Sequence, residues 1–369
     1  MSPLEPLLAW LRTGTVTTER RDFPTGTALP DGRLDLCKSG LGPDGAAQVA
    51  AALRPGVVKH LLLGTDGLGD GAAEVAGQAV EREVETLYLG CNGITAGGVC
   101  RIADNLRMSP QAGKVTGVWL KRNPIGDGDA AAAIIEAARS LRTVDLVQTG
   151  LDATGVARVA AAVLAAAESG RRIERLYVGG NPLGPAGAAP LAALLAADAV
   201  SELYVSAAQL GDEGACTIAD ALVPGSLRRI SLASNGIGPH AAARLVASAA
   251  WAGVEVCDLG RVKAAKVLDA GDNRLDEAAT TAIADALAER PHGLRHLVLS
   301  NTGLDSRAAH RLLDGAGRAA TPTRFVLGKG VATSIRRRLD LASAMVPERP
   351  PVPADVAAVQ SVHRQPPPG

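Results

Sequence analysis

A repeated pattern is the feature of this sequence that most restricts its fold. Each copy has three apolar residues spaced three and then two residues apart, followed by Asn, then Gly or Pro, and an Ala-rich stretch. The clearest copies span 84–94, 173–183 and 227–237. One copy cannot bury its own apolar side, so the copies must stack on one another along the chain.

Each copy predicts one short strand, one turn and one helix. The alternating apolar residues indicate a strand, and the Ala-rich stretches have helical spacing. The central apolar pair of the ten copies begins at Leu34, Leu61, Leu87, Val118, Val144, Leu176, Leu203, Ile230, Cys257 and Leu297. Most intervals are 26 to 32 residues, and the last is 40 because residues of about 261–271 are inserted before Asn273.

The turn residues predict how neighbouring copies connect. Asn92, Asn123, Asn181, Asn235 and Asn273 follow their strands, where an Asn side chain can pair with backbone groups that a turn leaves free. Asp or Pro then starts a helix, as at 126–127 and 184–185. Strands stack about 4.8 Å apart and helices about 8–10 Å apart, so a stack of such units must curve.

These copies resemble the ribonuclease-inhibitor type of leucine-rich repeat, a subfamily that also includes Ran GTPase-activating proteins. The resemblance covers about residues 33–330. It implies an α/β solenoid shaped like a horseshoe, with a parallel sheet on the concave face and helices on the convex face. Members of the family mostly bind proteins through the concave sheet and the adjoining loops, so the resemblance also implies a protein or peptide partner.

An open stack exposes apolar ends, which predicts a cap on each side of the repeats. We assign residues 1–32 to an N-terminal cap, with a short helix that carries Leu7, Leu8 and Trp10. Phe325 is expected to open a capping strand, and residues 331–345 a closing helix with Ile335, Leu339, Leu341 and Met345 on its apolar side. Residues 346–369 are rich in Pro and are predicted to be a disordered tail.

Composition excludes several classes of function. The 38 basic and 38 acidic residues balance, whereas proteins that bind nucleic acid or membrane surfaces usually carry a basic excess. The opening segment does not have the pattern of a signal peptide, and no apolar run reaches the roughly 18 residues that span a bilayer. The five widely spaced cysteines indicate neither a disulfide framework nor a metal site. We therefore expect a cytoplasmic monomer without cofactor or metal.

The candidate binding residues come from the predicted strands. The residue between the two central apolar residues faces away from the core, and this column contains all three Tyr and one of the three Trp of the chain. From this column we select Tyr88, Trp119, Asp145, Tyr177, Tyr204 and Asp258. The aromatics and Asp145 are expected to form one mostly exposed band that anchors a partner. The alternative is that the aromatics only support neighbouring strands.

Charged residues flank this predicted band. Arg175, Glu202 and Arg229 occupy the other outward position of three successive strands and should alternate in sign across the sheet. They either contact the partner or neutralise one another on a solvated face. Arg261, Lys263 and Lys266 of the insertion are possible loop contacts, and a loop without function is the alternative.

The sequence predicts a non-enzymatic protein-interaction module. The aromatic band occurs without a catalytic triad, metal motif or phosphate-binding loop, so we name no catalytic or cofactor-binding residue. The alternative function, which follows from the family resemblance alone, is a regulator of an enzyme, similar to a GTPase-activating protein, or an enzyme that uses acids and tyrosines of the concave face.

Overall fold

The computed structural model describes residues 2–348 and 351–363. The chain forms two compact units. Unit 1 contains residues 1–150, 165–173 and 351–369, and unit 2 contains residues 151–164 and 174–350. Helix α6 (Ala153–Glu168) has residues in both units.

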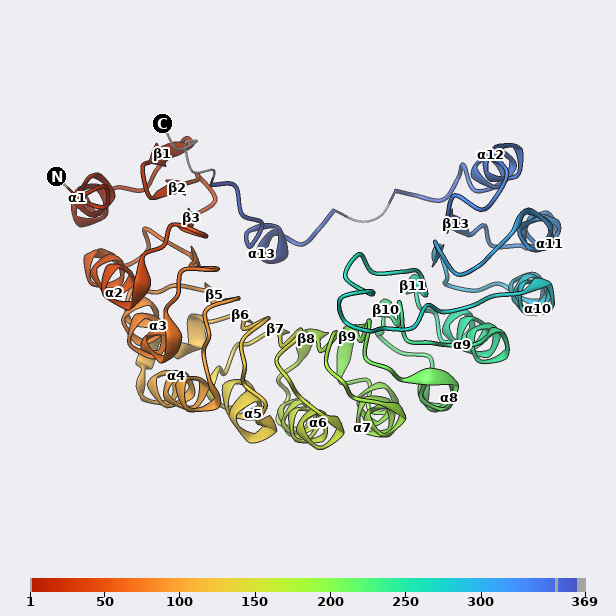
Figure 1. The fold of residues 1–369 in the computed structure, drawn as a ribbon, viewed down its shortest axis with the longest axis horizontal. Coiled ribbons are helices and arrows are strands. Elements are labelled where there is room, and N and C mark those ends of the chain that lie inside the picture. Colours follow the sequence, from red (N-terminus) through yellow and green to blue (C-terminus); the bar gives the residue numbers. More distant parts are fainter. Residues whose placement is uncertain (1, 349–350, 364–369) are drawn as a thin grey trace. The chain divides into compact units, whose positions relative to one another are not determined.

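Unit 1 is a sheet covered on one side by helices (Figure 1). Its strands, in sheet order, are β1 (Arg21–Phe23), β2 (Gly26–Ala28), β3 (Arg33–Asp35), β4 (His60–Leu62), β5 (Thr86–Tyr88), β6 (Gly117–Trp119) and β7 (Thr143–Asp145). Strands β1, β2 and β3 pair antiparallel, and β3 to β7 pair parallel. The helical elements are α1 (Glu5–Thr13), α2 (Gly42–Ala52), η1 (Gly69–Gly71), α3 (Ala72–Glu81), α4 (Ala96–Met108), η2 (Pro110–Lys114), α5 (Gly128–Ala137) and α13 (Ala354–Ala357).

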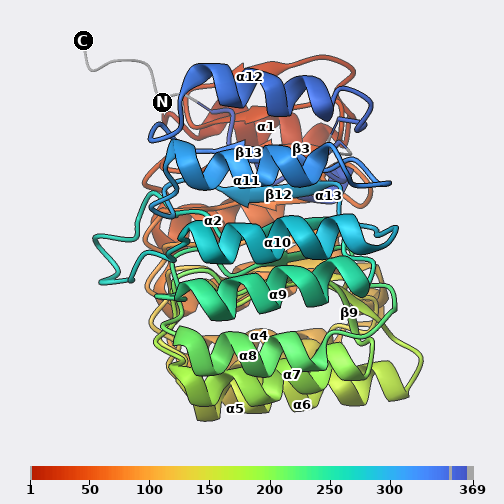
Figure 2. The same ribbon diagram turned by 90° about the vertical axis from the view of Figure 1, so that its right-hand side faces the viewer.

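Unit 2 repeats the same arrangement. Its strands, in sheet order, are β8 (Ile173–Tyr177), β9 (Val200–Tyr204), β10 (Arg229–Ser231), β11 (Val256–Asp258), β12 (His296–Leu299) and β13 (Arg324–Leu327). The helical elements are η3 (Pro185–Gly187), α7 (Ala188–Ala196), α8 (Gly211–Ala221), α9 (Pro239–Trp251), α10 (Glu277–Glu289), α11 (Ser306–Ala316) and α12 (Thr333–Ala342). Figure 2 shows helices α8 to α12 side by side in a row.

The strand pairing confirms the predicted register within each unit. The first central apolar residue of each copy pairs with its counterpart in the next, as Leu34 does with Leu61 and Ile230 with Cys257. These residues are fully buried between sheet and helices. One repeat therefore contributes one strand and one helical layer, which makes the fold an α/β leucine-rich-repeat solenoid.

Buried asparagines join one repeat to the next. The Asn123 Oδ1 accepts hydrogen bonds from the backbone N–H groups of Asn92 (3.0 Å) and Ile94 (3.1 Å). Its Nδ2 donates to the carbonyl oxygens of Leu89 (3.0 Å) and Leu120 (2.8 Å). One side chain thus pairs with backbone groups of two successive turns, which are buried and would otherwise lack partners.

Small side chains let the helices approach closely. A Cβ atom added to Gly315 of α11 would lie 2.5 Å from the Cβ atom of Ala284 in α10, which is closer than atoms can pack. The absence of that atom therefore permits this contact between α10 and α11. The Ala-rich composition serves the same purpose elsewhere, because Ala side chains are buried along most of the repeat helices.

The two caps differ in part from the sequence prediction. Helix α1 buries Leu7, Leu8 and Trp10, but the antiparallel β1–β2 hairpin that follows was not anticipated. At the other end, α12 buries Leu339, whereas Leu341 is 66% exposed and Met345 lies beyond the helix with its side chain in solvent. The predicted apolar side of the closing helix is therefore only partly covered.

The C-terminal segment also differs from the prediction of a disordered tail over residues 346–369. Residues 354–357 form α13, and residues 360–363 form hydrogen bonds with β2 and β3 of unit 1. Figure 1 shows α13 on the side of the unit 1 sheet that faces away from α2 to α5. Residues 349–350 and 364–369 lie outside the described part of the chain.

Candidate protein-binding faces

In each unit, the side of the sheet opposite the helices carries the candidate residues, and we call it the open face. Side chains alternate along a strand, so positions two residues apart share a face. On unit 1 the pairing aligns Asp35, Leu62, Tyr88, Trp119 and Asp145 in one column. On unit 2 it aligns Tyr204, Ser231, Asp258 and Val298. The predicted band therefore divides between two units, with Tyr177 at the same position of β8 in unit 2.

Tyr177 and Tyr204 form the centre of the open face of unit 2. Their rings are stacked, with centroids 4.2 Å apart and an interplanar angle of 9°. Both side chains are half-buried, so part of each remains accessible. Stacking fixes the two rings relative to each other.

Charged side chains surround the tyrosine pair in unit 2. The Tyr204 hydroxyl donates a hydrogen bond of 2.5 Å to Glu202 Oε2, and Arg229 Nη1 donates one of 3.2 Å to the Tyr204 hydroxyl. Arg175 Nε lies 3.7 Å from Glu202 Oε1. Glu202 therefore contacts Arg175 directly, while Arg229 contacts the Tyr204 hydroxyl. The three charged residues lie on neighbouring strands as predicted, but the Tyr204 hydroxyl forms hydrogen bonds with both Glu202 and Arg229.

The electrostatics of this cluster keep Tyr204 protonated. Burial raises its pKa, and the neighbouring Tyr177 and Glu202 raise it further because a second negative charge there would be unfavourable. The hydroxyl consequently remains a donor to Glu202 over the physiological pH range. On the adjoining strands, Ser231 lies 3.5 Å from Asp258 Oδ2, and the Asp258 Oδ1 accepts a hydrogen bond from the Gly260 N–H.

On unit 1 the candidate residues are more buried than predicted. Trp119 is 3% exposed and Asp145 is 6% exposed, whereas the sequence analysis expected wet side chains. The Trp119 ring lies against Gly117, two residues earlier on the same strand, where a Cβ atom would be 2.1 Å from a ring carbon. The physical reason for the difference is that the Trp119 ring packs over Gly117, and that α13 lies on the same side of the unit 1 sheet (Figure 1).

Burial changes the titration of Asp145. It raises the pKa of the carboxyl group to about 6, against the smaller lowering effects of the hydrogen bond from the Val147 N–H and of nearby Lys121 and Arg122. Lys121 also places its ammonium group 5.1 Å from the centroid of the Tyr88 ring. Tyr88 is half-buried, so it remains the most accessible aromatic of this column.

The inserted loop extends from the end of β11. Residues 261–271 form turns without helix or strand and project at the left of Figure 2. Arg261, Lys263 and Lys266 are exposed, and Arg261 Nε lies 3.1 Å from Asp272 Oδ1. Asn273 then restores the repeat by accepting hydrogen bonds from the N–H groups of Asn235 and Ile237.

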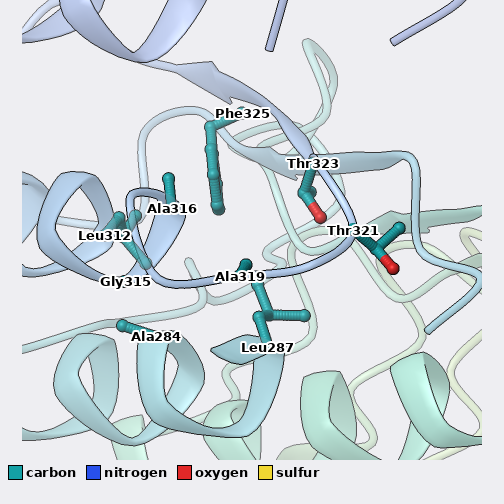
Figure 3. A pocket seen from close by; sticks show the side chains of 9 residues that line it. All are labelled: Ala284, Leu287, Leu312, Gly315, Ala316, Ala319, Thr321, Thr323 and Phe325. Carbon is teal, nitrogen blue, oxygen red and sulfur yellow. The ribbon is translucent and has the colours of Figure 1, made fainter. Parts of the chain in front are cut away.

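A small cavity in unit 2 belongs to the core and not to a binding face. Its volume is about 10 Å³, which has room for one water at most. It lies between α10, α11 and β13, and Figure 3 shows mainly apolar side chains around it, including Leu287, Leu312 and Phe325. Among residues 2–348 and 351–363, no three His, Cys, Asp or Glu side chains are grouped so that they could hold a metal ion.

Sequence reasoning missed a polar site formed by the N-terminal cap and the first repeat. Thr27 of β2 and Asp35 of β3 pair across the antiparallel strands, and both are fully buried. Asp35 follows Leu34 and so occupies the outward position of the first copy, but its neighbours in space come from residues 361–363. A contact over that separation in the chain leaves no local sequence pattern.

Comparison with known proteins supports the fold. No protein-family model matches the chain, and no curated protein matches it either. A solved structure described as the crystal structure of the Rad7 and Elc1 complex in yeast aligns with a TM-score of 0.56 and 14% identity, over 82% of this chain and 70% of its own. At that identity the likeness concerns the fold alone. No described helix is long and apolar enough to cross a bilayer. The chain is a leucine-rich-repeat solenoid similar in fold to that structure.

Proposed function

We propose that this protein is a non-enzymatic interaction module of the ribonuclease-inhibitor-like type, and that it binds a protein partner on the open face of unit 2. The contact residues are Tyr177, Glu202, Tyr204, Arg229 and Asp258, while Arg175, which is 7% exposed, supports Glu202 from beneath the surface. The stacked pair of Tyr177 and Tyr204 is the observation that carries this proposal.

The tyrosine pair has the properties of a protein-binding anchor. Tyr side chains combine a large apolar area with a polar tip and are frequent at the energetic centre of interfaces. Stacking and the hydrogen bond to Glu202 fix the position of Tyr204 before a partner arrives. A fixed side chain loses less conformational freedom on binding, so more of the contact energy contributes to affinity.

Charges around the pair define the chemistry of the partner. Arg175 and Arg229 stand beside Glu202, and Asp258 lies two strands from Tyr204. The face thus offers both signs of charge around an apolar centre, which suits a folded protein surface with an apolar patch and a mixed charged rim. Arg261, Lys263 and Lys266 of the inserted loop are proposed as additional contacts at the edge of this unit.

Unit 1 is proposed to contribute less to this interaction. Tyr88 is the candidate there, because Trp119 and Asp145 are nearly fully buried. The structural neighbour described above is a complex of two proteins, which supports the use of such a fold in protein assembly.

Site-specific crosslinking tests the proposal. A photoreactive phenylalanine derivative placed at Tyr204 should give one dominant crosslinked protein in cells, whereas the same group at Trp251 should not. Trp251 is a matched control because it is an aromatic residue of unit 2 that is 46% exposed at the end of helix α9. Equal crosslinking from both positions, or none from Tyr204, would contradict a binding face around the tyrosine pair.

A further inference from the structure

The C-terminal segment occupies the open face of unit 1 through specific polar contacts. Asp355 Oδ2 lies 3.4 Å from the Thr143 hydroxyl of β7, and the Gln360 carbonyl accepts a hydrogen bond of 2.6 Å from Arg33 Nη1 of β3. Strand order places β7 and β3 four strands apart, so the segment crosses the sheet. Ala358, between these two contacts, is buried.

Asp35 is the centre of these contacts. Its Oδ2 accepts hydrogen bonds from the Ser361 hydroxyl (3.0 Å), the Val362 N–H and the His363 N–H (2.7 Å). Its Oδ1 accepts one from the Cys37 N–H (3.0 Å), which holds the carboxylate in position. Hydrogen bonds to an ionised acceptor are about twice as strong as neutral ones. A single carboxylate oxygen thus binds two consecutive backbone N–H groups and a hydroxyl group.

The neighbouring cap residues complete the site. His363 Nδ1 lies 3.2 Å from the Thr27 hydroxyl, and the Arg33 guanidinium is held by Asp31 at 2.7 Å. Thr27 and Asp35 are paired across β2 and β3, so the antiparallel pairing of these strands brings them to one place. The site is therefore built where the N-terminal cap meets the strand of the first repeat.

The C-terminal segment resembles a bound peptide more than a part of the hydrophobic core. Helix α13 is only four residues long, and no residue within it is fully buried. The residues that precede it are rich in proline, as in Pro351-Val352-Pro353. Most of the hydrogen bonds are formed by residues 360–363, which are bound largely through their backbone, as ligands of other peptide-binding domains are.

We propose that the open face of unit 1 is a peptide-binding site and that residues 354–363 are its built-in ligand. The site takes a segment with a hydroxyl side chain, two consecutive backbone N–H groups that point to the same side, and a histidine, which is the Ser361-Val362-His363 pattern. While the C-terminal segment is bound, this face is closed to other segments of that kind. The proposal is independent of the interaction proposed for unit 2.

The experiment opens the site in the full-length chain without changing the sheet. Val362→Pro removes one of the N–H groups that Asp35 binds, so the segment should dissociate. A fluorescent synthetic peptide with the sequence of residues 351–363 is then added, and binding is measured by anisotropy. The Val362→Pro chain should bind the peptide at least tenfold more tightly than the wild-type chain, whose own segment competes.

Two controls identify the chemistry of the contact. A peptide that itself carries the Val362→Pro change should bind at least tenfold more weakly, and this control leaves the protein unaltered. Asp35→Asn in the Val362→Pro chain should weaken binding of the unchanged peptide to a similar degree, whereas Asp44→Asn, at an exposed acid of α2, should not. Failure of the peptide to bind the opened chain, or equal binding by wild-type and opened chains, would overturn the proposal.

Discussion

Asn123 occupies a turn in which backbone groups of two repeats are buried. Its side chain pairs with two N–H groups and two carbonyl oxygens, so its removal leaves several polar groups without partners. We expect Asn123→Ala to lower the free energy of unfolding by about 3 kcal/mol. Asn105→Ala, which removes one hydrogen bond to the Ala73 carbonyl at a half-buried site, should cost only about 1 kcal/mol. Urea unfolding of both variants measures the contrast, and equal losses would contradict it.

The raised pKa of Asp145 makes the free energy of unfolding depend on pH. Its pKa is about 6 in the folded chain and about 4 in an unfolded one, so the folded state binds the proton more tightly. The stabilisation from this group is complete below about pH 4 and is lost as the pH rises through about 6. Relative to Asp145→Asn, the wild-type protein should therefore lose about 2–3 kcal/mol of stability between pH 4 and pH 7. A difference that stays constant over that range in urea titrations would show that the carboxyl group titrates normally.

For single residues, the sequence predicted which face of the sheet a side chain lies on but not how deeply that side chain is buried. The alternation of side chains along a strand correctly placed Asp35 and Trp119 in the outward column. Their burial could not be predicted, because it depends on Gly117 beneath the ring and on residues more than 300 positions away. The asparagine turns were predictable, because an Asn recurs at the same place after the strand in several copies.

In strand β6, Gly117 leaves the space that the Trp119 ring of the same strand occupies. Gly117 has no room for a side chain because the Trp119 ring lies on it. Gly117→Ala should displace the ring and lower stability by about 1–3 kcal/mol. Gly113→Ala in η2 is the matched control, because nothing lies within 4 Å of the added atom. Thermal unfolding of the pair tests this account, and identical midpoints would show that the ring moves without cost.

Helix α12 closes the repeats with only part of its apolar side. Leu339 is 2% exposed and Leu341 is 66% exposed. We expect Leu339→Ala to destabilise the end of unit 2 by about 2–3 kcal/mol, and Leu341→Ala by less than about 0.5 kcal/mol. Hydrogen exchange of α12 should accelerate in the first variant alone. Similar exchange in both would mean that the helix packs differently.

The elements that the sequence did not predict share one physical cause. The β1–β2 hairpin has strands of three residues, as several repeat strands do, but it lies before the first repeat, so no recurring pattern marks it. Helix α13 has four residues in a proline-rich context and depends on contacts with β3 and β7. Elements stabilised by their own pattern were predictable, whereas those stabilised by distant partners were not.

Within each unit, a repeat contacts mainly its neighbours along the chain, so whole repeats should be removable. Deletion of residues 203–256 joins Glu202 to Cys257 at equivalent positions of their strands. The shortened chain should stay folded, with an unchanged circular dichroism signal per residue and a lower unfolding temperature. Deletion of 203–246 breaks the register and serves as the control. A register-preserving deletion that aggregates as readily as this control would contradict the repeat boundaries.

Affinity for a purified partner tests the proposed binding face of unit 2 most directly. The measurement compares wild type, the Tyr177→Ala/Tyr204→Ala double variant and Trp251→Ala by calorimetry, with thermal unfolding of each free chain as a check on folding. Loss of the stacked pair should weaken binding by at least about 2 kcal/mol, a factor of roughly 30, because anchor residues dominate such interfaces. Trp251→Ala should leave affinity unchanged. A double variant that is folded and binds as tightly as wild type would contradict the central claim.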